Sequence, residues 1–142
     1  MLGSALREMK TVVRAAEVRG IIKYHILQRR TVTYRGVSEP LGLLAVGADF
    51  FKLLGMISRE DYRRGRALSS AIVVSKGTGV PSYGFFEHAQ RIGAFDPNRQ
   101  SKEEFWTEQM QRLGYDVDKL EVKLSWSSPE EDEFDEDLDE TG

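Results

Sequence analysis

The chain has 142 residues, of which 40% are hydrophobic and 30% are charged, with a formal net charge of -3. This length fits one domain with a short extension, and the hydrophobic content is sufficient for a packed core. Because the sequence has no cysteine, disulfide frameworks, thiolate zinc sites and cysteine nucleophiles are excluded. No apolar run reaches the roughly 18 residues that span a bilayer, and no signal-peptide pattern appears. We therefore expect a cytoplasmic protein without membrane association.

The first half of the chain is predicted to be mostly helical. Apolar residues recur at helical spacing over about residues 4–29, in two pieces divided near Gly20. A β-branched and aromatic run over 31–34 predicts a small strand. One helical turn or a short helix that ends near Gly42 comes next. A longer amphipathic helix follows over about residues 45–65, with Gly65 as its stop.

The second half is predicted to contain the best strand and two further helices. The run over 67–76 is rich in β-branched residues and is the strongest strand signal in the chain. A glycine- and proline-rich loop follows it, and a short helix then covers about residues 85–93. Ser101 and Glu104 have the spacing of a capping box, which predicts that another helix begins there.

These elements predict one small α+β domain, mostly helical with a short antiparallel sheet. Helix–turn–helix followed by a strand and an ordered loop is the element order of a winged-helix domain. We place this domain in residues 1–115, with a long N-terminal helix that is a candidate for homodimerisation. An edge strand is predicted within residues 116–128, and residues 129–142 are predicted to form a disordered acidic C-terminal tail.

The charge is divided unevenly between the body and the end of the chain. Residues 1–114 contain 18 Lys and Arg against 11 Asp and Glu, a net charge of +7, whereas residues 115–142 contain 2 against 12, a net charge of −10. Such asymmetry points to a polyanionic partner, a membrane surface, or shielding of the basic body by its own acidic tail. Phe134 and Leu138, four residues apart in the tail, would also suit a short helix that docks on a protein partner.

The glycine-rich loop after the predicted strand lacks the residues of a phosphate-binding motif. A dinucleotide fingerprint needs G-x-G-x-x-G, and although Gly77 and Gly79 fit, Ser82 stands at the third glycine. A P-loop needs Lys and then Ser or Thr after its last glycine, where this chain has Phe85 and Phe86. The loop is therefore predicted to be a tight reversal that the two aromatic residues anchor to the core.

Candidate catalytic and metal-binding groups are few. The chain has two histidines, and His25 lies in an apolar helical stretch where a half-buried structural role is expected. Two distant histidines provide too few ligands for a metal site, so we expect no metal, no cofactor and no catalysis. A small unrecognised enzyme with Ser70, His88 or Glu87 in a pocket is retained as the third alternative.

Basic residues gather around the predicted helix–turn–helix, where the second helix would enter the major groove and flanking cations would hold phosphates. The candidate nucleic-acid contacts are Arg29, Arg30, Arg35, Lys52, Arg59, Arg63, Arg64, Arg66 and Lys76. Glu60 and Asp61 lie among them, so a merely solvated charged face is the competing interpretation. We predict a non-catalytic protein that binds nucleic acid, in particular duplex DNA. The alternative is a protein-interaction module, an adaptor or inhibitor that uses the same surface and the acidic tail.

A resemblance in pattern points in the same direction. The runs TVTYRGVSEPLG, VGADFFKLLGMIS and ALSSAIVVSKGTGVPSYG, within residues 31–84, are similar in order and spacing to the C-terminal winged-helix domain of the O6-alkylguanine-DNA alkyltransferases and alkyltransferase-like proteins. Ser70 stands where the alkyl-accepting cysteine of that family would be, and Ala48 falls near its arginine finger. Alkyl transfer and base flipping are therefore not implied. What the resemblance implies is a surface that lies on DNA.

Overall fold

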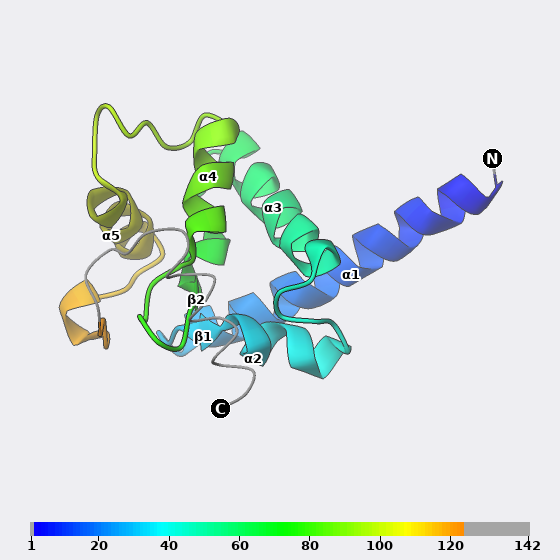
Figure 1. Cartoon of the computed structure of the whole chain (residues 1–142), viewed down its shortest axis with the longest axis horizontal. Coiled ribbons are helices and arrows are strands. Elements are labelled where there is room, and N and C mark those ends of the chain that lie inside the picture. Colours follow the sequence, from blue (N-terminus) through cyan, green and yellow to red (C-terminus); the bar gives the residue numbers. More distant parts are fainter. Residues whose placement is uncertain (1, 124–142) are drawn as a thin grey trace.

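The structure is a computed structural model that describes residues 2–123, so the predicted tail over 129–142 lies outside the described residues. The fold is mostly helical, with five α-helices and a two-stranded sheet among the described residues (Figure 1). In chain order, with η for a 3₁₀ helix, the elements are α1 (Leu2–Leu27), β1 (Val32–Thr33), α2 (Tyr34–Ser38), η1 (Glu39–Leu41), α3 (Ala48–Arg63), η2 (Ser69–Ile72), β2 (Val73–Val74), α4 (Tyr83–Arg91), α5 (Lys102–Arg112) and η3 (Val117–Lys119).

The first helix is continuous, whereas the sequence predicted two pieces divided at Gly20. Gly20 has open space around it and makes no turn, so α1 passes through this position without a break. The second half of α1 packs against α3 and buries Val18 and Ile22 completely. The first half projects from the domain (Figure 1) and leaves Leu6 and Met9 exposed. Homodimerisation through this half stays a prediction.

The sheet is parallel, so the predicted antiparallel sheet is wrong. β1 pairs with β2 in the register Val32↔Val73 and Thr33↔Val74. The chain passes through α2, η1, α3 and η2 between the two strands, and a crossover of this length allows the second strand to run in the direction of the first. A winged helix would add an antiparallel strand after β2. Within residues 2–123 no strand follows β2, since the next regular element is α4. The fold class is therefore corrected to a mostly helical domain with a two-stranded parallel sheet among the described residues.

The predicted strand over 67–76 is reduced to the two residues of β2, because side chains rather than a neighbouring strand satisfy its backbone. The Leu68 N–H donates to Gln109 Oε1 at 2.8 Å, and Trp106 Nε1 donates to the Ala71 carbonyl at 2.9 Å. The whole segment from residue 67 to residue 75 is buried. Since buried backbone groups must find partners, these two α5 side chains allow the segment to coil into η2.

Asp61, at the end of α3, fixes η2 to both α3 and α1. Its side chain is almost fully buried. One carboxylate oxygen accepts from the Ser69 N–H at 3.0 Å and from Ser69 Oγ at 2.6 Å, and the other accepts from the Arg19 guanidinium at 2.9 Å. Hydrogen bonds to an ionised group are stronger than those between neutral groups. One carboxylate therefore joins three elements that are far apart in the sequence.

Aromatic rings form the core between α4 and α5. The rings of Phe95 and Phe105 lie 4.8 Å apart, and Phe86 contacts both at 6.1 and 6.4 Å between ring centroids. All three side chains are buried. Phe85, the other predicted core anchor, is only partly buried: its ring lies 6.1 Å from that of Phe105 and 5.0 Å from that of Phe86, and it also lines a surface groove.

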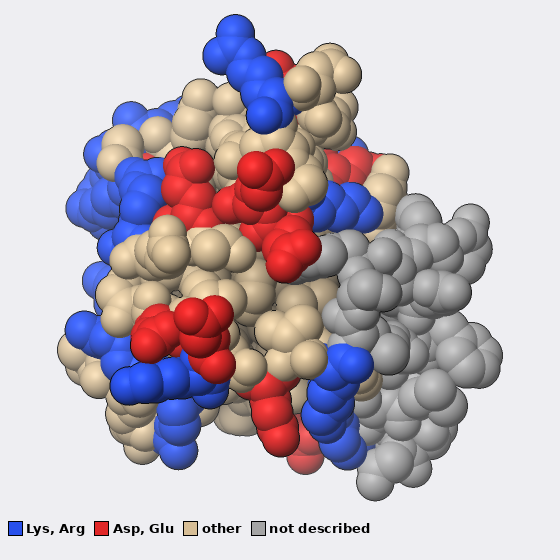
Figure 2. Space-filling model, turned by 90° about the vertical axis from the view of Figure 1, so that its left-hand side faces the viewer, with Lys and Arg blue, Asp and Glu red and all other residues tan. Residues whose placement is uncertain are grey.

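The start of α5 confirms the predicted capping box. Ser101 Oγ accepts from the Glu104 N–H at 3.1 Å, and Glu104 Oε1 accepts from the Ser101 N–H at 2.8 Å. Hydrogen bonds to the Glu104 carboxylate, first from the backbone and then from the side chain of Ser101, lower the pKa of Glu104. Glu103 and Glu108 are also exposed on α5. Figure 2 shows this side of the molecule, where acidic and basic side chains are interspersed.

The region in which an edge strand was predicted, residues 116–128, contains η3 and then residues 120–123 without regular structure; its remainder lies outside the described residues. This part of the chain crosses the loop that follows β2. The Lys123 N–H donates to the Thr78 carbonyl at 2.9 Å. Gly79 has a φ of 79°, and a Cβ at this position would lie 2.1 Å from the Glu121 carbonyl oxygen. Glycine is required here both for the backbone conformation and for the close approach.

Replacing Asp61 by Ala is expected to lower the free energy of unfolding by about 3 kcal/mol, because the change leaves Arg19 and the Ser69 N–H without their buried partner. Glu60 is the matched control, since it lies 3.6 Å from the same arginine but is half-exposed, and Glu60→Ala is expected to cost less than about 1 kcal/mol. Urea unfolding measures both. Equal effects of the two substitutions would contradict the role assigned to Asp61.

Acidification is expected to destabilise the protein partly through His25. Burial, and then the charge of Arg30, lower the pKa of His25 below its ordinary value, and its Nδ1 is buried without a hydrogen-bond partner. The folded state therefore favours the neutral ring. This contribution to stability is complete above the unfolded pKa of about 6.5, and it is lost as the pH falls through the folded pKa. Urea unfolding at pH 7.5 and 5.5 should show a smaller difference for His25→Gln than for the parent chain; an unchanged difference would refute this.

Candidate functional site

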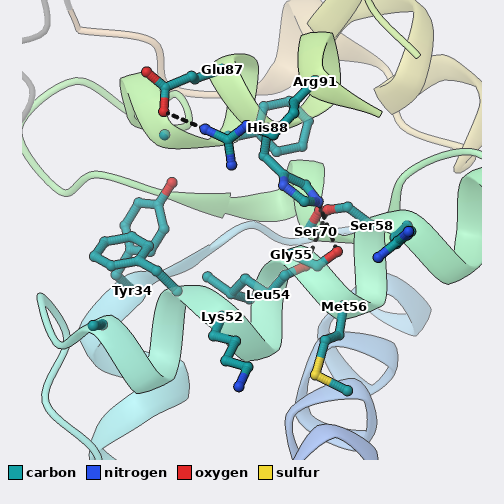
Figure 3. A pocket seen from close by; sticks show the side chains of 15 residues that line it. Tyr34, Lys52, Leu54, Gly55, Met56, Ser58, Ser70, Glu87, His88 and Arg91 are labelled. Carbon is teal, nitrogen blue, oxygen red and sulfur yellow. Dashed lines mark hydrogen bonds and ion pairs between the residues drawn. The ribbon is translucent and has the colours of Figure 1, made fainter. Parts of the chain in front are cut away.

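A groove of about 490 Å³ lies between α3 and α4, with the start of α2 and η2 at its base. Its volume is in the range of ligand-binding clefts. Its lining has an apolar and aromatic part, which we call the floor, and a polar part; Figure 3 shows residues that line the groove. The floor contains Tyr34, Phe51, Leu54, Met56 and Phe85, and the polar lining consists of Lys52, Ser58, Arg59, Ser70, Glu87, His88 and Arg91.

The sequence of α3 places three cations on the side of the helix that faces this groove. Lys52, Arg59 and Arg63 follow one another at intervals of seven and four residues, which correspond to one face of a helix. Lys52 and Arg59 line the groove, and Arg63 continues their row. All three side chains are exposed, and none forms an ion pair with another described residue. The row therefore keeps its charge available for a partner.

Two of the three acids of the same helix are engaged on its other sides, whereas Asp49, in the first turn, is exposed and has no ion pair with another described residue. Asp61 is buried against Arg19, and Glu60 lies 3.6 Å from Arg19 and 3.9 Å from Arg64. The competing interpretation, in which these acids neutralise the arginines of α3, therefore applies to Arg64 but not to Arg59. Glu60 and Asp61 are paired mainly with Arg19 of α1, so they do not neutralise the cations on the groove face of α3.

The opposite wall of the groove comes from α4. His88 Nε2 lies 2.9 Å from the Gly55 carbonyl oxygen of α3, as Figure 3 shows. A Cβ at Gly55 would lie only 3.2 Å from the His88 ring, so the absence of a side chain allows the two helices to approach this closely. Arg91 joins the rim beside Glu87, with which it pairs at 3.0 Å. Glu87 is thus the one acid among three cations in the lining of the groove.

Two serine hydroxyls meet at the base of the groove. Ser58 Oγ donates to the Leu54 carbonyl at 3.1 Å and lies 2.5 Å from Ser70 Oγ. Because the Ser58 proton is used on Leu54, Ser70 is the donor in the contact between the two hydroxyls. The structure brings Ser70, His88 and Glu87 into one groove, as the enzyme alternative required, but within residues 2–123 Ser70 has no hydrogen bond to the histidine. The two hydrogen-bonded hydroxyls contribute to the polar lining of the groove.

Tyr34 fixes the base of the groove to the start of α4. Its hydroxyl accepts from the Ser82 N–H at 2.8 Å and contacts Ser82 Oγ at 3.0 Å. Ser82 is the N-cap residue of α4. The ring of Tyr34 also lies 5.7 Å from that of Phe51, between centroids. These contacts hold two aromatic rings beside the row of cations on α3.

The remaining predicted contacts do not converge on the groove. Arg35 pairs with Glu39 at 2.9 Å on the outer side of α2. Arg29 adopts a φ of 56° where α1 ends, and its guanidinium donates to the Ile26 carbonyl at 2.7 Å. The predicted residues outside the lining of the groove are Arg29, Arg30, Arg35, Arg63, Arg64, Arg66 and Lys76. Two of the nine predicted residues, Lys52 and Arg59, therefore line the groove. A third, Arg63, continues their row along α3.

Sequence reasoning missed Arg91 and the whole aromatic floor. Arg91 follows Glu87 by four residues, the spacing of an ordinary solvated ion pair on a helix, so nothing in the sequence distinguished it. Phe85 was predicted to be a core anchor, and Phe51 was not singled out. The available signal was that each stands next to another phenylalanine in a predicted helix, and adjacent residues on a helix do not face the same way.

Comparisons with models of known families, with curated proteins and with solved structures gave no match for this chain. The two positions that the resemblance to alkyltransferases singled out, Ala48 and Ser70, both line the groove. The resemblance itself stays a prediction.

Metal-binding and membrane-spanning features were searched in the described residues. Residues 2–123 contain no group of three or more His, Cys, Asp or Glu arranged to hold a metal ion. None of the helices in this range has both the length and the apolar character that a bilayer crossing requires.

The close contact between His88 and Gly55 leads to a test with a matched glycine. Ala in place of Gly inside a helix commonly adds up to about 1 kcal/mol to stability. Gly20→Ala should show this gain, because its surroundings are open. Gly55→Ala should show little gain or a loss, since its methyl group would meet the His88 ring at 3.2 Å. Urea unfolding of both variants measures the difference, and equal gains would contradict the packing of α3 against α4.

Proposed function

We propose that this protein binds nucleic acid, without catalysis, through the groove between α3 and α4. The observation that carries the proposal is the row of Lys52, Arg59 and Arg63, which has no acidic partner among the described residues. Cations of this kind neutralise phosphates and release bound counterions. The aromatic floor beside them adds surfaces that can stack on bases.

The length of the row favours a polymer over a small anion. A helix rises 1.5 Å per residue, so Lys52 and Arg63 are separated by about 16 Å along α3. A single phosphate or carboxylate ligand cannot contact both ends of such a row. The backbone of a nucleic acid carries charges at regular intervals and can contact several of these side chains together. Arg91 provides a further cation across the groove.

Duplex DNA is the partner that we propose, since the exposed cations lie along one helix and a helix with such a row can contact the phosphates that border a groove. A single strand would use the same cations and also the rings of Phe51 and Phe85. An acidic peptide is the second candidate function, and the aliphatic part of the floor, Leu54 and Met56, favours it because apolar side chains suit a peptide. The three ligands give different results in one binding assay.

Replacing Lys52 and Arg59 together by Ala is expected to weaken binding to a mixed-sequence duplex roughly tenfold and to lower the salt slope by about two. The matched control replaces Arg99 and Lys119, which removes the same charge from exposed positions that do not line the groove. Fluorescence anisotropy at several salt concentrations, with duplex, single strand and an acidic peptide as ligands, measures both variants.

The control variant is expected to bind nearly as the parent chain does. Equal losses in the two variants would show that binding depends on total charge only and would contradict the groove as the interface. Retention of a peptide with no measurable affinity for either nucleic acid would establish the second candidate instead.

A further inference from the structure

The acidic segment, residues 129–142, is the feature of this chain that the groove does not yet explain. All 20 Lys and Arg lie in residues 1–123, where they exceed the 14 acids and give a net charge of +6. Residues 124–142 contain nine acids and no base, and all nine acids belong to the acidic segment. One chain thus carries a polyanion next to a domain that we propose to bind polyanions.

The described chain ends beside the loop that leads into the groove wall. Lys123 is held there by its hydrogen bond to the Thr78 carbonyl, and α4, which begins at Tyr83, follows that loop. Residue 129 stands six positions after Lys123, a distance of at most about 20 Å in an extended chain. The compact part of a domain of this size has a radius of gyration of about 14 Å. The acidic segment can therefore reach the groove from its point of attachment.

The charges of the two parts are complementary. The groove face of α3 presents Lys52, Arg59 and Arg63 without acidic partners among the described residues. The 14 acids of the body are spread over residues 1–123, whereas the segment carries nine acids within residues 129–142. A short tether also raises the local concentration of the segment to the millimolar range. An attraction too weak to hold a free peptide is then sufficient within one chain.

Apolar residues of the segment match the floor of the groove. Phe134 and Leu138 are the apolar side chains among the acids, and they are four residues apart. The floor offers Phe51, Met56 and Phe85, which are only partly buried by the domain itself. Aromatic and thioether side chains make favourable contacts with an added ring. An extension without apolar residues could not make these contacts with the floor, whereas Phe134 and Leu138 can.

We infer that residues 129–142 occupy the groove of their own chain in the absence of nucleic acid, with their acids against the α3 cations and Phe134 and Leu138 on the aromatic floor. The biological consequence rests on the proposed function: the segment competes with nucleic acid for one site. Weak, non-specific ligands then fail to displace it, and only ligands that bind the groove strongly do so. Because exposed charges are screened by salt, the competition is strongest at low ionic strength.

The first test compares the full chain with a full-length variant in which the nine acids are replaced by Asn and Gln. The expected affinity of the neutral variant for a duplex is about tenfold higher at 50 mM salt and less than twofold higher at 500 mM. A full-length Phe134→Ala/Leu138→Ala variant should show a smaller gain that persists at high salt. A gain that does not change with salt in the neutral variant would overturn the charge-based part of the inference.

The second test needs no nucleic acid. Amide spectra of the ¹⁵N-labelled full chain and of the neutral variant should differ around Phe51, Lys52, Phe85 and Arg91, and not along α5. The differences should be independent of protein concentration, since the segment acts within one chain. Spectral differences confined to other surfaces, or no differences at all, would overturn the inference. Differences that grow with protein concentration would also overturn it, because they would show that the segment binds a second copy of the chain.

Together the two tests separate this inference from the proposed function. Groove shifts in the spectra of a protein that binds no nucleic acid would support the inference and refute the proposed function. Equal binding of nucleic acid by both chains, with identical spectra, would refute the inference and leave the proposed function standing.

Discussion

The carboxylate of Asp61 is the contact on which the arrangement of this domain depends. A buried charge costs several kcal/mol unless it is paired and hydrogen-bonded, and here Arg19 of α1 and Ser69 at the start of η2 provide three hydrogen bonds. These donors fix α1, α3 and η2 relative to one another. Because β2 directly follows η2, the same contact places β2 beside β1 and determines where the loop to α4 begins.

The position of Asp61 also determines which surface of α3 is left for a partner. Asp61 follows Lys52 by nine residues, two and a half turns of helix, so the two side chains point in opposite directions. Anchoring Asp61 toward α1 therefore turns Lys52 and Arg59 toward α4 and solvent. Since Arg19 supplies the positive charge that Asp61 needs, the cations of α3 are not used inside the domain. The contact between His88 and Gly55 then brings α4 close enough to complete the groove.

Structural features that depend on neighbouring residues could be predicted from the sequence. Features that depend on contacts between distant residues could not. The Ser101–Glu104 capping box was predictable because its partners are three residues apart. The segment over 67–76 has the composition of a strand, but its conformation depends on Gln109, which is about 40 residues away and satisfies its backbone. The parallel direction of β1 and β2 likewise depends on how the long connection between them crosses the domain, which no local pattern in the sequence shows. Within the site, Lys52 and Arg59 could be predicted from charge, whereas Arg91 could not.

The groove can be examined as the interface by titrating ¹⁵N-labelled full-length protein with a short mixed-sequence duplex and mapping the amide shifts onto the structure. If the groove binds nucleic acid, the perturbed amides and the arginine side-chain signals will cluster at Lys52, Arg59 and Arg91, and the shifts will decrease as salt is added. Shifts confined to the projecting half of α1 or to α5, or a spectrum that does not change at saturating duplex, would contradict it.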